Sequence, residues 1–150
     1  MSICIREAVY SDLEGLLELY TQLNDNSMPV IDDRVHAVWQ RLLGREGIHT
    51  LIAAEGSAIL SSVTVTIIDS LTHGQRPYAL VEYVITGHAY RGRGLAGALL
   101  ERARELAEEA GCYKMMLVTG HSEPHVHRLY QRAGYRSEGK TAYVQYLPTE

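Results

Sequence analysis

Hydrophobic and polar residues alternate along this chain with two periods, one typical of strands and one typical of helices. Short runs rich in β-branched and other apolar residues predict strands at 3–9, 49–54, 58–68, 78–86, 112–118, 135–137 and 141–147. Apolar residues spaced three and four positions apart predict helices at about 13–23, 33–44, 95–110 and 124–133. This order predicts an α/β fold in which a mixed sheet carries helices on both faces.

Local signals refine the ends and the placement of these elements. Ser11 and Glu14 have the spacing of a capping box, so Ser11 is predicted to cap the first helix. Glycine and polar residues at 55–57 predict a hairpin turn between two strands. The nearly unbroken apolar run at 112–118 predicts a central strand that is covered on both faces.

Composition narrows the class of protein. The 150 residues, of which 46% are hydrophobic and 21% charged, fit a single domain over residues 1–150 with no internal repeat. The net charge of −4 argues against broad nucleic-acid binding, which needs a basic surface. No apolar run approaches the roughly 20 residues of a membrane span, and no signal-peptide pattern begins the sequence. Cys4 and Cys112 lie too far apart in sequence for a disulfide framework and are expected to be buried, so we expect a reduced, cytoplasmic protein.

The segment between the strand at 78–86 and the helix at 95–110 carries the most informative chemistry. Gly92, Gly94 and Gly97 allow a sharp turn whose N–H groups, with the positive end of the helix dipole, suit a phosphate or diphosphate. The G-x-G-x-x-G spacing also occurs in dinucleotide-binding proteins, but here it comes late in the chain, and the next strand lacks the expected acidic residue. The residues alone therefore leave open a dinucleotide, another phosphorylated cofactor, or a tight turn without a ligand.

Two motifs make the chain resemble the GNAT superfamily of acetyl-CoA-dependent N-acetyltransferases. The segment 91–96 (RGRGLA) matches that family's R/Q-x-x-G-x-G/A cofactor motif, and the segment 127–135 is similar to its H-R-F-Y-E-x-x-G-F element, with Leu129 and Tyr135 in place of phenylalanine. The resemblance implies an enzyme with the GNAT fold, a central mixed sheet flanked by about four helices, and acetyl-CoA as co-substrate. It implies these cofactor-binding residues: Val84, Ile85, Thr86, Arg91, Gly92, Arg93, Gly94, Leu95, Ala96 and Gly97.

The resemblance also implies catalytic roles for two side chains. Tyr130 would act as general acid and protonate the leaving thiolate, although the same residue also reads as a tyrosine that packs a helix face. Glu82 would act as general base through a water, because a carboxylate in an apolar setting suits proton acceptance near neutral pH. A glutamate on the exposed side of a strand is the equally weighted alternative. A backbone N–H of Val84, Ile85 or Thr86 would meet the carbonyl oxygen.

Other nucleophiles and metal ligands have weaker patterns. His125 and His127 point in different directions on a helix, so we expect no metal, and His121 is a candidate for the acceptor pocket. Cys112 is the rival nucleophile, but it has no evident His or Asp partner.

The acceptor is expected to be a small-molecule amine. The predicted acceptor pocket is built from the first two helices, the loop 69–77 and the final strands. Acetylation of a protein N-terminus or lysine and a non-catalytic acyl-CoA sensor are the alternative functions. The final strands between 135 and 147 are expected to have an exposed edge, and since members of the GNAT superfamily often pair there, the resemblance implies a homodimer.

Overall fold

The computed structural model describes residues 2–23 and 26–149 and contains one five-stranded sheet with helices on both faces. The strands are β1 (Cys4–Glu7), β2 (Ile48–Glu55), β3 (Ala58–Ile68), β4 (Tyr78–Thr86) and β5 (Met115–Leu117). The helices are α1 (Leu13–Tyr20), α2 (Asp33–Gly44), α3 (Leu95–Glu109) and α4 (Pro124–Arg132), with short 3-10 turns η1 (Tyr10–Asp12) and η2 (His88–Tyr90). The strands follow chain order across the sheet, antiparallel up to β4, and β5 runs parallel to β4. The predicted mixed α/β sheet is therefore confirmed.

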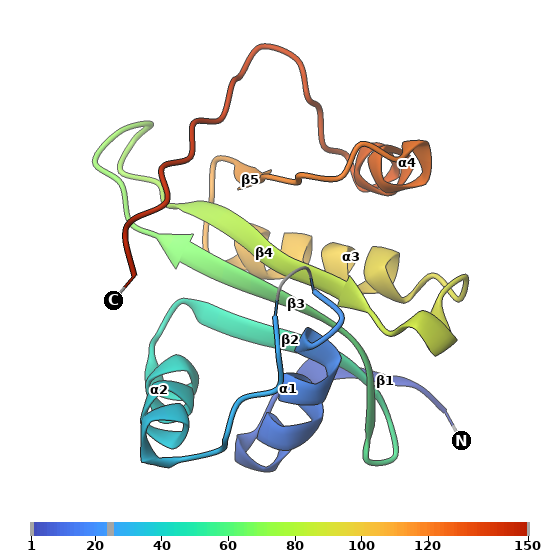
Figure 1. The fold of residues 1–150 in the computed structure, drawn as a ribbon. Helices are drawn as coiled ribbons and strands as arrows, with labels where there is room; N and C mark the ends of the chain where they lie inside the picture. The colour runs from blue at the N-terminus through green and yellow to red at the C-terminus, as the bar shows by residue number, and fades with distance from the viewer. Residues whose placement is uncertain (1, 24–25, 150) are drawn as a thin grey trace.

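Two cores lie on opposite faces of this sheet, with α3 over one face and α1 and α2 over the other (Figure 1). The side chains of β2 alternate between them, because successive strand residues point to opposite faces. Leu51 and Ala53 pack with α3, whereas Ile52 and Ala54 pack with α1 and α2. The predicted hairpin between β2 and β3 is confirmed. No helix in the described residues has the length and apolar content that a membrane span needs.

The first helix begins differently from the prediction. The chain enters α1 through η1, which places Ser11 inside the 3-10 turn and not at the helix cap. The carboxylate of Asp12 accepts a hydrogen bond from the Val9 N–H at 2.7 Å and pairs with the Arg6 guanidinium at 2.7 Å. The hydrogen bond from Arg6 holds the pKa of Asp12 below its ordinary value. Asp12 therefore fixes the turn that leads into α1, and the prediction that Ser11 caps this helix is wrong.

The C-terminal third departs most from the prediction. The apolar run at 112–118 forms only the three-residue β5, which lies at the sheet edge with Met116 39% exposed, not a covered central strand. The strands predicted at 135–137 and 141–147 do not form, and Tyr143 and Tyr146 are 93% and 91% exposed. In Figure 1 the chain after α4 follows an open arc. Strand propensity measures how well side chains fit a paired, half-covered surface, and no described strand supplies that surface here.

Candidate functional site

A bulge in β4 shapes the centre of the site. Ser62 pairs with Ile85 and Thr64 with Glu82, so the single residue between them on β3 faces both Tyr83 and Val84. Tyr83 has φ = 54°, a left-handed conformation that is rare for a bulky residue and is found mainly at strained, functional positions. The pairing of β4 with β5 covers Ala79–Val81 and stops before the bulge. Beyond the bulge, the edge of β4 toward β5 is open to a ligand.

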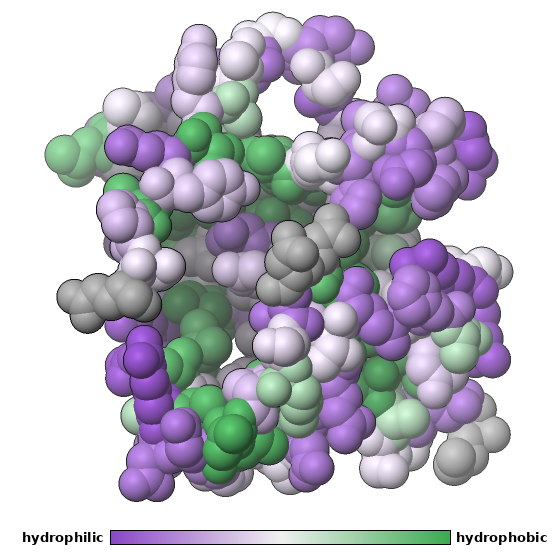
Figure 2. Space-filling model, in the orientation of Figure 1, coloured by the Kyte–Doolittle hydropathy of each residue, from purple (hydrophilic) through white to green (hydrophobic). Residues whose placement is uncertain are grey.

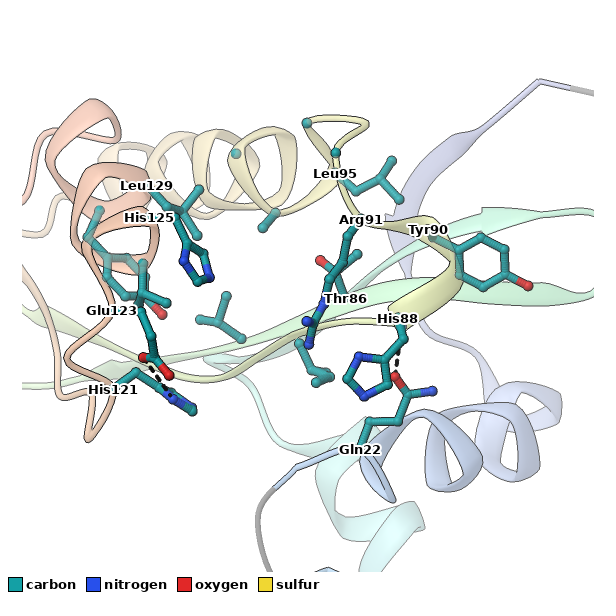
Figure 3. A pocket seen from close by; sticks show the side chains of 18 of the residues that line it. Gln22, Thr86, His88, Tyr90, Arg91, Leu95, His121, Glu123, His125 and Leu129 are labelled. Carbon is teal, nitrogen blue, oxygen red and sulfur yellow. Dashed lines mark hydrogen bonds and ion pairs between the residues drawn. The ribbon is translucent and has the colours of Figure 1, made fainter.

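A cavity of about 600 Å³, which we call the glycine-turn cavity, begins at this open edge. It lies between the end of β4, the turn into α3, α4 and the residues that follow α1 (Figure 3). The proposed cofactor residues that line it are Val84, Ile85, Thr86, Arg91, Gly92, Gly94, Leu95, Ala96 and Gly97. Arg93 is outside the described lining, and its guanidinium lies over the Tyr90 ring, 5.8 Å from the centroid. The Arg91 side chain points into the cavity.

The turn into α3 exposes backbone to this cavity. Gly92 and Gly94 have φ of 80° and 75°, values that favour glycine, and Gly94 is the N-cap of α3. A Cβ added at Gly92, Gly94 or Gly97 would meet no protein atom within 4 Å, so space for a ligand lies directly over the backbone. The N–H groups and the helix dipole at this end attract anions, and Arg91 adds a positive charge. The arrangement fits the diphosphate of coenzyme A.

The two proposed catalytic residues occupy different surroundings. Tyr130 is half-buried and lines the glycine-turn cavity, and burial raises the pKa of its phenol, so the hydroxyl keeps its proton at neutral pH. Tyr135 packs against it at 6.2 Å between ring centroids. Glu82 is exposed and is absent from the described lining of the cavity, so the apolar surroundings expected for it are not found.

The other candidates of the sequence analysis also have places in the structure. His121 and His125 line the glycine-turn cavity, and the Nδ1 atom of His121 lies 3.4 Å from the Glu123 carboxylate. Among residues 2–23 and 26–149, no cluster of three His, Cys, Asp or Glu side chains is arranged to hold a metal ion. Burial raises the pKa of the Cys112 thiol, which disfavours the thiolate that a nucleophile needs. Cys4 is exposed, so the expectation that both cysteines are buried is wrong for Cys4.

A second cavity of about 440 Å³, the α1–α2 cavity, lies between these two helices and the sheet. Figure 2 shows it as a hollow with hydrophobic walls between α1 and α2. The first two helices line it, as predicted for the acceptor pocket, whereas neither the loop 69–77 nor the final strands are among its described lining. Sequence reasoning missed Tyr20 and Tyr83 in its wall, because one reads as part of a helical stripe and the other as an ordinary strand residue.

Gln22 joins the helical side of the site to the turn side. Its side-chain oxygen accepts a hydrogen bond from the His88 N–H at 2.8 Å, which links the segment after α1 to η2 (Figure 3). Gln22 lines the glycine-turn cavity, and its neighbour Leu23 lines both cavities. No motif marked Gln22, since its role depends on the turn that passes beside it.

Comparisons with known proteins agree on one family. Residues 13–135 match the family described as the acetyltransferase (GNAT) family. The chain is 30% identical over 130 residues to the glucosamine 6-phosphate N-acetyltransferase of Trypanosoma brucei brucei, covering 85% of this chain and 84% of that protein. A protein of Oryza sativa subsp. japonica, assigned as glucosamine 6-phosphate N-acetyltransferase 2, is 33% identical over 87 residues, which cover 58% of this chain and only 51% of the rice protein. A solved structure from Agrobacterium tumefaciens str. C58, assigned as an acetyltransferase, is 36% identical with a TM-score of 0.88, over 96% of this chain and 99% of that one.

Proposed function

Because the chain belongs to the acetyltransferase (GNAT) family and is thus an acetyl-CoA-dependent N-acetyltransferase, we propose that its acceptor is the primary amine of a small molecule. One observation carries the transfer chemistry: a single cavity brings the glycine turn, the open edge of β4 and Tyr130 together. The separate α1–α2 cavity of about 440 Å³ supports a small-molecule acceptor. Acetyl-CoA supplies an activated thioester, and the remaining parts of the reaction fall to side chains and backbone groups around it.

We assign one task to each of these groups. We assign stabilisation of the charge on the thioester oxygen to a backbone N–H of Val84, Ile85 or Thr86, residues that line the cavity, while the amine nitrogen forms its bond to the carbonyl carbon. Tyr130 donates its phenolic proton to the sulfur as the carbon–sulfur bond breaks. Glu82, through a water, removes the proton that the amine must lose. No covalent acyl-enzyme is needed, because the amine attacks directly.

The assignment of Glu82 predicts a specific change in pH dependence. Glu82 pairs across the sheet with Thr64, which lines the α1–α2 cavity, so we place the Glu82 carboxylate on the face of the sheet that carries this cavity. Glu82→Gln is expected to lower kcat/KM by about 10²-fold and to remove the acidic limb of the pH–rate profile. Glu46→Gln, a change at another exposed glutamate, serves as control and keeps both. A Glu82→Gln profile with the original acidic limb excludes Glu82 as the base.

Thiol release from acetyl-CoA tests the function itself. We expect release that depends on an added amine and increases with its concentration, measured with a thiol-reactive dye. The panel contains glucosamine 6-phosphate, for which the relatives are named, an alkylamine, an arylalkylamine, an amino acid, an aminoglycoside and a peptide with a free N-terminus and lysine. Release with the peptide alone supports the protein-acetylating alternative. Tight acetyl-CoA binding without release for any amine supports a non-catalytic sensor and contradicts the proposal.

We also propose a cytoplasmic homodimer. Two free cysteines and no disulfide agree with a reducing compartment. The exposed apolar side chains of Tyr143, Val144, Tyr146 and Leu147 agree with pairing between two copies through the C-terminal segment. Both statements stay predictions.

A further inference from the structure

We propose that the α1–α2 cavity is the acceptor site, and that it takes an amine carried on an apolar alkyl or aromatic body in preference to a phosphorylated sugar. This inference rests on the proposed function, because it specifies the substrate class of the same reaction. It begins from the walls of the cavity. Leu13, Leu16 and Leu17 of α1 face Val35, Val38 and Trp39 of α2 across it. A volume of about 440 Å³ is large enough for a small organic molecule.

The α1–α2 cavity reaches the place where the thioester is expected. Leu23 lines both cavities. On the bulge of β4, Tyr83 lines the α1–α2 cavity and the next residue, Val84, lines the glycine-turn cavity. The two cavities therefore meet at the bulge, and a molecule held between α1 and α2 can direct its terminal nitrogen toward the glycine-turn cavity. The body of the acceptor thus lies in the α1–α2 cavity, while its reacting nitrogen lies at the bulge.

The end of this cavity beside the β4 bulge suits an ammonium group. The rings of Tyr20 and Tyr83 lie 6.1 Å apart between centroids and are tilted by 48°. Aromatic faces attract organic cations at exposed as well as buried sites, and here Tyr20 is half-buried while Tyr83 is exposed. Both Tyr20 and Thr64 line the cavity, so their hydroxyls offer the amine polar contacts beside the two rings. An amine entering at this end is recognised as a cation before it loses its proton.

A phosphorylated sugar has the wrong chemistry for these walls. Its hydroxyls would lose their water against leucine, valine and tryptophan side chains, and burial of polar groups without hydrogen-bond partners is unfavourable. Among the described residues that line the cavity, Arg34 is the only cation, and it is exposed. An apolar body gains from the same walls, because it removes hydrocarbon surface from water. The inference therefore separates this chain from the substrate for which its curated relatives are named.

Binding can be measured apart from turnover, because Trp39 is the single tryptophan of the chain and lines this cavity. We expect 2-phenylethylamine to change the tryptophan fluorescence saturably and glucosamine 6-phosphate to leave it unchanged. In thiol-release assays at saturating acetyl-CoA, kcat/KM for 2-phenylethylamine should exceed that for glucosamine 6-phosphate by 100-fold or more. Equal values, a preference for the sugar phosphate, or no fluorescence response to 2-phenylethylamine would overturn the inference. A saturable response without acetylation of any amine contradicts the proposed function and keeps the assignment of the cavity.

A matched pair of variants on α2 locates the effect. Val38 lines the cavity and Leu43 does not, and both are partly exposed at 39% and 36%, so neither change removes a buried core residue. Val38→Gln is expected to lower kcat/KM for 2-phenylethylamine by tenfold or more without changing KM for acetyl-CoA. Leu43→Gln should leave both values unchanged. Equal effects of the two variants on kcat/KM place the acceptor elsewhere.

Discussion

Tyr130→Phe is expected to lower kcat by about 10²- to 10⁴-fold, the usual contribution of a general acid, while KM for acetyl-CoA stays within about twofold. The change removes one hydroxyl and keeps the ring that packs in the cavity wall. Without that proton the sulfur must leave as a thiolate, which raises the barrier of carbon–sulfur cleavage. Steady-state kinetics with acetyl-CoA and the best amine of the panel measure both constants.

The raised pKa of Tyr130 gives this prediction its pH dependence. A general acid works in its protonated form, so activity is lost only as pH rises through its pKa, which burial moves above the ordinary value of 10.0. No basic limb that belongs to Tyr130 should therefore appear below that value. Tyr135→Phe is the matched control, because burial raises the pKa of this neighbour to about 12 and its hydroxyl is outside the described lining of the cavity. If Tyr130→Phe lowers kcat and acetyl-CoA affinity equally, the general-acid assignment fails.

Gly97→Ala is expected to stabilise the free protein and to weaken acetyl-CoA binding at the same time. Gly97 lies in the first turn of α3 with an ordinary helical φ, so alanine should add about 0.5–1 kcal/mol to the free energy of unfolding. The new Cβ meets no protein atom within 4 Å and enters the space assigned to the diphosphate. We expect Kd to rise about tenfold or more, a loss of roughly 1.4 kcal/mol in binding free energy. Urea unfolding and isothermal calorimetry measure the two effects.

Gly44→Ala is the control that separates the effect of helix propensity on stability from the effect of an added Cβ on acetyl-CoA binding. Gly44 ends α2, where an added Cβ also meets no protein atom, and it is outside both described cavity linings. This variant should be stabilised without any change in acetyl-CoA affinity. Unchanged affinity in Gly97→Ala would place the diphosphate away from the first turn of α3.

The sequence predicted elements best where both ends carried a signal. The bounds of β4 and β3 match the prediction, since Pro77 and Gly87 flank β4 and the turn 55–57 precedes β3. The apolar run at 112–118 was misplaced because an unbroken run looks the same in a covered central strand and in a short edge strand. The segment 141–147 has strand composition without a strand to pair with. Composition shows that residues would fit in a sheet, but a strand forms only where a neighbouring strand is present to pair with it.

The sequence predicted the part of the site that glycine residues and backbone groups form. It did not predict the parts that depend on how side chains pack. The letters of the turn marked Gly92, Gly94 and Gly97, and the cavity lies over all three. The bulge at Tyr83 could not be predicted from the sequence, because its residues have ordinary strand composition. The extra residue becomes visible in the structure, in the register with β3. The sequence predicted the two helices that line the α1–α2 cavity but not the cavity itself. The space between Leu17 and Val38 depends on how the apolar faces of α1 and α2 pack, which the sequence pattern does not show.

The residues that line the two cavities come from two parts of the chain, which meet between Tyr83 and Val84. Apart from Gln22 and Leu23, the glycine-turn cavity is lined by residues that follow this point, whereas the described lining of the α1–α2 cavity precedes it or ends on it. Substitutions before position 84, other than at Gln22 and Leu23, can thus alter which amine is accepted without touching the described lining of the glycine-turn cavity. Laboratory evolution toward new acceptors should accumulate its mutations before position 84, and a graft of that part of the chain onto a related donor-binding part would transfer acceptor choice as a unit.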